Sequence, residues 1–382
     1  MTDVTELLIR IETLEVKEAQ RELDKLTKQS SKTEKAGKAL GNVFKVGVAA
    51  GLAAVTAQGV KSIAMLVKFD KKMKEVSSIA GVSNKRMKEL RKEVLQLSTS
   101  MGVDATDAAG ALYQALSAGV PQENAIQFLA TSSQLAIAGV TDTAVAVDGL
   151  TNVINAYGLN AREAGNVSDD LFTTVKLGKT TVEELSRTMA NATVPAAALG
   201  VSYQEVLAAT VSLTKQGVAT AEAMTKQKAL FTSLSKPSDT LAMKYKAMGI
   251  ESGKAGIAAF GLVGFMNKLN DAFDGNDNEI QKALGSSESY MGMLALVGEK
   301  GQEASKALAE LGNNAGAAMK AAELNSSTLE NSMNKLNSAS TLFMENLESR
   351  YKLLEKIGAG INNVALGISG QGGARNAGIA AA

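Results

Sequence analysis

Apolar positions recur at helical spacing through the middle of this 382-residue chain. They fall three or four residues apart with polar positions between them, as on helices that bury one face. Three such stripes are Met87, Leu90, Val94, Leu97 and Met101; Val147, Leu150, Ile154 and Tyr157; and Ala164, Val167, Leu171 and Val175. The stretch 104–118 is built largely from alanine and leucine, so we expect it to pack very close to its neighbours.

Glycines separate these stripes at intervals of 17 to 22 residues. The series is Gly81, Gly102, Gly119, Gly139, Gly158, Gly178, Gly200 and Gly217. Six of the eight are followed by valine and one by leucine, and Lys179 is the exception. A left-handed glycine just past a helix, followed by an apolar residue that folds back, is the Schellman helix end.

Helix starts follow most of these glycines. The predicted starting residues are Ser83, Asp104, Pro121 at the first helical position, Thr141, Asn160 and Ser202. Ser202 with Glu205, and Thr181 with Glu184, have the spacing of capping boxes.

The sequence therefore predicts an all-α fold. We expect a multi-helix bundle of roughly 15-residue helices joined by Gly-Val stops, with amphipathic or coiled-coil helices at both ends. Nine Phe, six Tyr, no Trp and three Pro suit closely packed helices better than sheets. Whether the helices close into a bundle or continue as a solenoid stays open, although the spacing fits single helices rather than two-helix repeats.

Five regions are predicted along the chain. They are an N-terminal amphipathic helix over 1–45, with a short strand as the alternative at its start; an apolar small-residue helix over 46–67; a compact helical core over 68–250; a looser helical region with a second apolar run over 251–324; and an amphipathic helix with a Gly/Ala-rich tail over 325–382. The first helix is either solvated and packed on the core or a self-associating coiled coil.

Residues 46–60 carry no charge between Lys45 and Lys61. A helix that spans a bilayer needs about 20 predominantly apolar residues, and this run is shorter. Gly47 and Gly51 form a GxxxG pair, which permits close helix approach. We interpret the run as a buried or self-associating helix in water, with conditional membrane insertion as the alternative.

Residues 61–92 hold ten Lys or Arg. This basic patch is a solvated face, or it binds an anionic membrane surface or a nucleic-acid backbone. No aromatic residues are interleaved for base stacking, and 40 basic residues against 39 acidic ones give no global field. We expect no sequence-specific nucleic-acid partner.

The acidic stretch 274–279 raises the question of a calcium site. An EF-hand loop needs glycine at its sixth position and an acid at its twelfth, where Glu279 and Gly285 stand. We therefore expect Asp277 or Asn278 to cap a helix that begins near Glu279.

The sequence shows no recognisable catalytic or metal-binding motif. There is no His and no Cys, which removes the commonest general base and metal ligand and all thiolate chemistry. Asp169-Asp170 and Glu183-Glu184 are explained by helix starts and polar faces. We therefore predict no catalytic, cofactor-binding or metal-binding residue, no cofactor and no enzyme activity. An enzyme that uses carboxylates is a third hypothesis, and it requires a concave pocket with two convergent acids.

Several segments, in this order, resemble the helical core of phage tail tape measure proteins. They are 111–119 (ALYQALSAG), 180–185 (TTVEEL), 196–218, 229–231 and 283–290. The resemblance covers roughly residues 65–345. It implies a protein of the virion that occupies the tail tube lumen, sets tail length, and is present in the host cytoplasm during assembly.

The resemblance also implies partners. These are the tail tube protein, tail tip or baseplate hub proteins, tail assembly chaperones, further copies of the chain in a helical bundle, and the host membrane during genome delivery. Such proteins usually continue far beyond this core, whereas this sequence stops at Ala382, so we expect a short tail, a truncated product or length encoded elsewhere. The alternative is a helical membrane-active protein, such as a pore-forming toxin or translocon component, that uses residues 46–67 directly.

Overall fold

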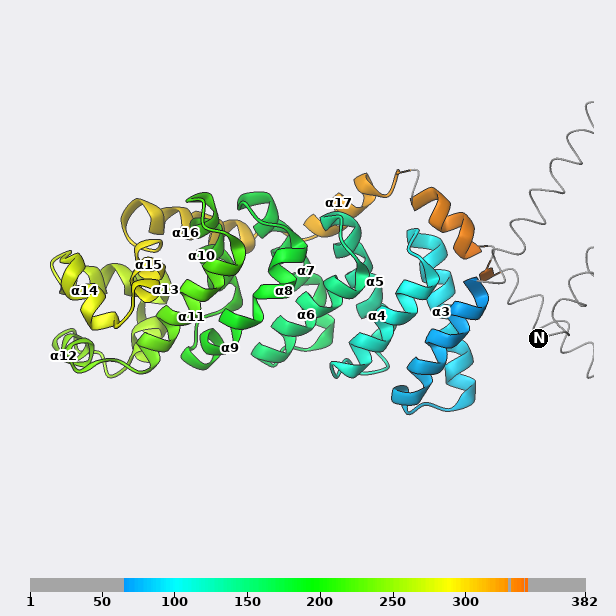
Figure 1. Cartoon of the computed structure of the whole chain (residues 1–382), viewed down its shortest axis with the longest axis horizontal. Helices are drawn as coiled ribbons and strands as arrows, with labels where there is room; N and C mark the ends of the chain where they lie inside the picture. Colours follow the sequence, from blue (N-terminus) through cyan, green and yellow to red (C-terminus); the bar gives the residue numbers. More distant parts are fainter. Residues whose placement is uncertain (1–64, 329–330, 340, 343–382) are drawn as a thin grey trace, which may run out of the picture. The chain divides into compact units, whose positions relative to one another are not determined.

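The computed structural model describes residues 65–328, 331–339 and 341–342. Contacts divide the chain into two units, Met1–Lys61 and Ser62–Ala382, and the described residues belong to the second. Every regular element among them is helical (Figure 1), so the predicted all-α fold is confirmed. Several predicted regions lie outside the described residues. These are the predicted amphipathic helix over 1–45, nearly all of the predicted apolar helix over 46–67, and residues 343–382 of the last region.

Residues 65–80 form the first described helix. The helices that follow are α3 (Asn84–Met101), α4 (Ala105–Ser117), α5 (Ala125–Gly139), α6 (Thr143–Tyr157), the short 3-10 helix η1 (Ala161–Glu163), α7 (Ala164–Leu177), α8 (Val182–Thr188), α9 (Ala190–Leu199), α10 (Tyr203–Lys215), α11 (Thr220–Ser235), α12 (Asp239–Ala247), α13 (Gly253–Ala272), α14 (Asp277–Leu284), α15 (Ser287–Leu294), α16 (Gly298–Leu311) and α17 (Ala317–Asn325). Residues 331–339 are again helical.

Helices that follow one another in the sequence also pack side by side. Thus α4 contacts α5 and α6, α5 contacts α6 and α7, α6 contacts α8 and α9, and α9 contacts α11. The result is an elongated bundle in which the helices succeed one another from α3 to α11 (Figure 1). The alanine-rich α4 is closely packed as expected, since Ala108, Ala109 and Ala111 have no exposed surface.

After α15 the chain turns back along this bundle. α16 packs on α10 and α7, and α17 packs on α7 and α5. Further on, the Ser338 hydroxyl donates to the Val103 carbonyl oxygen at 3.0 Å, in the turn between α3 and α4. We call α16, α17 and the helix over 331–339 the return segment; Figure 1 shows it in yellow to orange along the green and cyan helices.

Most of the predicted glycine stops have the predicted geometry. The six with positive φ are Gly81, Gly102, Gly119, Gly158, Gly200 and Gly217. The amide of Val201 folds back to the Ala196 carbonyl oxygen at 2.9 Å, as the Schellman motif requires. The capping box of Ser202 and Glu205 is present, and Thr181 accepts a bond from the Glu184 amide.

Gly139 and Gly178 correct the prediction. Gly139 is the last residue of α5, and Val140 takes the left-handed conformation in its place, with φ 51°. Gly178 is extended, with φ −101°. A Cβ on Gly139 would overlap the Val182 side chain, and one on Gly178 would lie 2.8 Å from Thr214 Oγ1. These two glycines are required by close helix approach rather than by a left-handed backbone.

Three predicted helix starts are displaced. The start predicted at Thr141 moves by one residue, because Asp142 occupies the N-cap position of α6. Pro121 lies in a turn, and α5 begins only at Ala125, with Asn124 as its N-cap. The cap of α14 is Asn276, whose side chain accepts a bond from the Glu279 amide at 3.3 Å, rather than Asp277 or Asn278. All three errors are shifts along the chain that leave the helix itself in place.

Among the described residues, no single helix is both long and apolar enough to cross a membrane. The helices α5 and α6 taken together are long and apolar enough, and they are bent by 114° relative to each other. The second apolar run, 255–266, forms part of α13, in which Ile257, Leu262 and Phe265 are buried.

The close approach at Gly139 generates a test. Gly139→Ala places a methyl group against Val182, and overpacking of this kind lowers the free energy of unfolding by about 1–3 kcal/mol. Urea unfolding of the purified chain measures the loss. Because Val182→Ala vacates the contested space, the double variant should lose less stability than the sum of the two single changes.

Gly110→Ala is the matched control. Gly110 lies inside α4, and an added Cβ would meet no atom within 4 Å. Alanine is favoured over glycine inside a helix, so this variant should gain up to about 1 kcal/mol. Equal stabilities of the two alanine variants would contradict the assigned packing at Gly139.

Candidate functional site

A buried carboxylate on α7 lies where three parts of the fold meet. Asp170 is only 3% exposed. Its Oδ2 accepts a hydrogen bond from the Tyr203 hydroxyl at 2.7 Å, and its Oδ1 accepts one from Asn314 Nδ2 at 2.8 Å. Tyr203 begins α10, and Asn314 lies just before α17. One side chain therefore ties α7 to α10 and to the return segment.

Burial sets the electrostatics of this cluster. It raises the pKa of Asp170, against the opposing effect of the hydrogen bonds from Tyr203 and Asn314. Burial also raises the pKa of the Tyr203 phenol, and the bond to Asp170 raises it further. The phenol therefore keeps its proton and acts as the donor. The attribution of Asp170 to a solvated polar face was wrong, because its partners lie far away in the sequence.

The neighbouring Asp169 caps a helix of the return segment. Its carboxylate accepts bonds from the backbone amides of Gly316 at 2.7 Å and Ala318 at 2.9 Å. These amides belong to the first turn of α17, where they have no partner within the helix. The negative charge of Asp169 also interacts favourably with the positive N-terminal end of the α17 macrodipole. Asp169 thus serves a helix start, but that of α17 rather than of its own helix.

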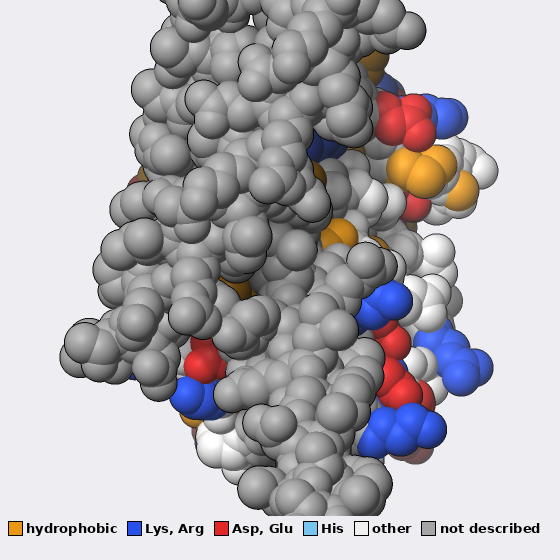
Figure 2. Space-filling view, turned by 90° about the vertical axis from the view of Figure 1, so that its right-hand side faces the viewer, with side chains coloured by type: hydrophobic (Ala, Val, Ile, Leu, Met, Phe, Trp, Pro, Cys, Tyr) orange, Lys and Arg blue, Asp and Glu red, His pale blue; other side chains and the backbone are white. Residues whose placement is uncertain are grey.

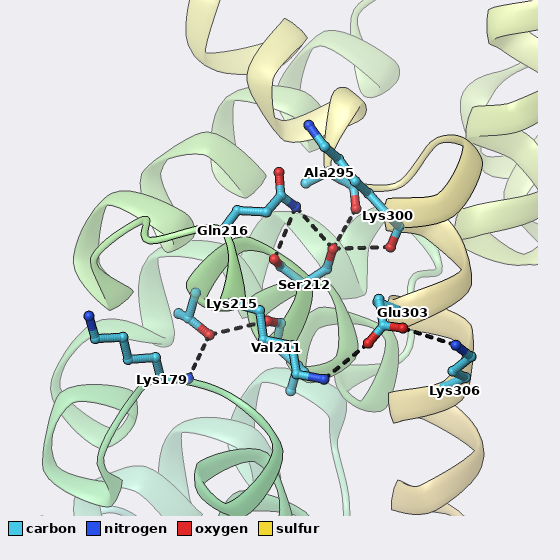
Figure 3. Close-up of polar contacts among 10 residues, drawn as sticks. Lys179, Val211, Ser212, Lys215, Gln216, Ala295, Lys300, Glu303 and Lys306 are labelled. Atoms are coloured by element: carbon cyan, nitrogen blue, oxygen red, sulfur yellow. Dashed lines mark hydrogen bonds and ion pairs between the residues drawn. The ribbon is translucent and has the colours of Figure 1, made fainter.

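A second contact joins α10 to the return segment. Figure 3 shows the Ser212 hydroxyl between the carbonyl oxygens of Ala295, at 2.7 Å, and Lys300, at 3.1 Å. Nearby, Lys215 Nζ lies 3.0 Å from Glu303, whose other oxygen binds Lys306. Ser212 is 2% exposed, whereas the ion pair lies at the surface. The buried hydroxyl matters more, because exposed ion pairs contribute only about 0–1 kcal/mol.

Two more side chains complete this line of contacts. Asn325 Nδ2 donates to the carbonyl oxygens of Ile137 and Ala138 at 3.1 and 3.2 Å, at the C-terminal end of α5. Ser338 bonds Val103, as described above. Carbonyl groups at a helix end lack partners within the helix, so these donors satisfy them. We call Asp169, Asp170, Ser212, Asn314, Asn325 and Ser338 the seam residues.

The seam residues are arranged to hold helices together. Each donor faces an acceptor, and the pairs are buried or partly buried, so the cluster fastens the return segment to α10, α7 and α5. No catalytic, cofactor-binding or metal-binding residue was predicted. Within residues 65–328, 331–339 and 341–342, no group of three or more His, Cys, Asp or Glu could hold a metal ion. Glu183 and Glu184 lie in the first turn of α8, as expected.

The basic patch over 61–92 contains more ion pairs than its sequence suggests. Arg91 binds Asp70 at 2.9 Å, and Arg86 binds Glu93 at 2.8 Å. Figure 2, which views the end bearing α3, shows lysine and arginine side chains interspersed with acidic ones. Pairing of this kind weakens the field that the patch presents to a distant anion.

The described residues define an all-α protein in which polar side chains fasten one helix to another. A family model described as "Phage-related minor tail protein" matches residues 91–288, which run from α3 into α15. The chain belongs to this family, and it is a component of the phage tail. The family is structural.

Two curated relatives carry the name of the family that the sequence segments resemble. The "Probable tape measure protein" of Clostridium phage phiCD119 is 28% identical over 325 residues, covering 80% of this chain and 33% of the relative. The "Tape measure protein" of Pneumococcus phage Dp-1 is 22% identical over 325 residues, covering 84% of this chain and 28% of the relative. The predicted resemblance to tape measure proteins is confirmed. The chain spans about a third of the length of these relatives, and no solved structure matches it.

The raised pKa of Asp170 predicts a pH dependence of stability. The folded chain binds a proton at this carboxyl more readily than the unfolded chain does. The free energy of unfolding therefore falls as pH rises from the ordinary value of 3.8 through the raised folded pKa. Asp170→Asn keeps the shape and removes the titrating group, so it should flatten this slope in urea unfolding between pH 4 and 7.

Two further variants complete that experiment. Asp170→Ala leaves the Tyr203 hydroxyl without its acceptor and removes one of the two acceptors of Asn314, so it should lose about 1–3 kcal/mol at neutral pH. Asp271→Asn removes an exposed carboxylate of α13 and should preserve the wild-type profile. A wild-type slope in Asp170→Asn would disprove the assigned role of Asp170.

The contact of Ser212 with the return segment can be tested by hydrogen exchange. Ser212→Ala leaves the Ala295 and Lys300 carbonyl groups without this donor, so the amides of α16 should exchange several-fold faster while those of α4 stay unchanged. Mass spectrometry of the full chain resolves the two helices. Ser305→Ala is the control, because that hydroxyl bonds the Gly301 carbonyl of its own helix. Equal exchange in both variants would show that Ser212 does not fasten α16.

Proposed function

We propose that this chain forms the folded helical module of a tape measure protein, which sets tail length as an internal scaffold of the tail tube. The observation that supports this most directly is positional. The matched family region, 91–288, coincides with the helical array that the return segment covers. Both relatives named as tape measure proteins align over about four fifths of the chain.

In this role the chain lies in the lumen of the tail tube and contacts the tail tube protein. Tail tip or baseplate hub proteins and assembly chaperones are its further partners, and copies of the chain associate with one another. Aid to genome delivery through the host membrane is the second part of the proposal, with residues 46–67 as the apolar stretch involved. The comparisons favour this tail role over a membrane-active protein unrelated to phage tails.

In this proposal the folded module and the length-setting part, which we call the ruler, are different segments of the protein. A single α-helix of 382 residues would be about 570 Å long at 1.5 Å per residue. The array instead stacks its helices side by side, so its own residues add little length. We assign length determination to segments outside the array, and we assign to the array the task of holding a defined folded body at one position in the tail.

Tail length in assembled particles tests the proposal. Deletion of residues 18–35 changes the chain outside the array. Because a stretch of this length spans about 27 Å as an α-helix, a helical ruler should give a tail shorter by about that length. Electron microscopy of particles from a phage that carries the deletion measures the change. A variant that replaces the lysines of the same segment by arginine keeps its length and serves as the control. Unchanged tail length in the deletion variant would contradict the ruler role.

A further inference from the structure

A cavity of about 900 Å³ opens near the end of the seam. It lies between the α3–α4 turn, α4, the α5–α6 turn and the start of the helix over 331–339. Its walls carry the carboxylates of Asp104, Asp107 and Asp142, together with the ion pair of Lys72 and Glu75. The cavity therefore holds an excess of negative charge.

Two of these three aspartate carboxylates have no bonding partner among the described residues. Asp104 accepts bonds from the amides of Thr106 and Asp107 at the start of α4. The side chains of Asp107 and Asp142 have no hydrogen-bond or ion-pair partner in the described part of the chain. Asp142 occupies the N-cap position of α6 without making the capping bond. Partial desolvation raises the pKa of Asp107, and the charges of Asp104 and Asp142 raise it further.

Polar atoms without a partner in the same walls indicate a missing ligand. Thr143 is 4% exposed, and its hydroxyl has no hydrogen-bond partner. The side-chain oxygen of Gln114 is likewise buried and unpartnered. Both residues line the cavity. Buried polar atoms are nearly always hydrogen-bonded. The free groups are mainly acceptors, so they call for a ligand rich in donors.

An apolar edge adds a second requirement. Val140 is 85% exposed and holds a left-handed backbone, with φ 51°. A β-branched residue is strained in that conformation. The left-handed backbone places the Val140 side chain at the mouth of the cavity, and Ile137 and Ala136 continue the apolar wall. A ligand that fits has a cationic donor group beside an apolar group.

We propose that this cavity binds an arginine-bearing peptide segment of another protein. The guanidinium lies against Asp107 and Asp142, and an apolar neighbour in the peptide packs on Val140. A guanidinium has five N–H donors and no acceptor, which matches a wall of carboxylate and amide oxygens. The cavity would bind such a segment whether or not the chain sets tail length.

The cavity also bears on the hypothesis of an enzyme that uses carboxylates, because that hypothesis requires a concave pocket with two convergent acids. Asp104 is engaged by the α4 backbone. Among the described residues that line the cavity, Lys72 is paired with Glu75, so Asp107 and Asp142 add like charge to one another. Like charges that share a site are stabilised by binding a cation, as in ion-pair recognition across protein interfaces. The wall therefore favours a cationic ligand over acid–base chemistry.

Fluorescence anisotropy of the full chain tests this binding. The probe is a fluorescein-labelled Ala-Arg-Leu-Arg-Ala peptide, and the same peptide with glutamate in place of arginine is the control ligand. We expect saturable binding of the arginine peptide, weakened at least about tenfold in the D107N/D142N variant. The variant E251Q/E299Q removes two exposed carboxylates elsewhere and should bind as the wild type does.

Val140→Gly keeps the test decisive if the double variant folds poorly. Glycine relieves the left-handed strain, so this variant should be at least as stable as the wild type, yet it should bind the arginine peptide about threefold more weakly because the apolar contact is lost. Wild-type affinity in both D107N/D142N and Val140→Gly would overturn the proposal. Equal binding of the arginine and glutamate peptides would also overturn it.

Discussion

The fold depends on the placement of one buried charge, the carboxylate of Asp170. A carboxylate removed from water is strongly unfavourable unless hydrogen-bond donors surround it. Here the donors come from Tyr203 on α10 and from Asn314, which lies 144 residues further along the chain. The carboxylate is therefore satisfied only when α7, α10 and the return segment are all in register. This requirement selects one arrangement among the many that apolar helix faces would tolerate.

The return segment changes how the array holds together. Contacts between successive helices are local, and an array built only from them can open at any junction. α16 and α17 contact α10, α7 and α5, which are not consecutive helices. A junction between those helices cannot open without also breaking seam contacts. Local packing thereby becomes cooperative over much of the described chain.

Sequence reasoning succeeded where the cause is local. A Schellman helix end involves six successive residues, so Gly200 and Val201 predict it directly from the sequence. It failed where the cause lies across the fold. Gly139 is required by Val182 on another helix, and Asp170 looks like any solvated acid until Asn314 is placed beside it. The acidic cavity was missed for the same reason, since Asp107 and Asp142 belong to different helices.

The glycine stops pose an apparent conflict between a folded array and an extended ruler. Glycine can also adopt the helical conformation, at a disadvantage of about 1 kcal/mol relative to alanine. Straightening the six left-handed stops would thus cost only about 6 kcal/mol, and Val140 would be relieved of strain. Extension would also expose the buried apolar face of every helix, which costs about 25 cal/mol for each Å² of apolar surface exposed. It would break the contacts of the seam residues as well. Burial and the seam, rather than the glycines, therefore keep this part of the chain folded.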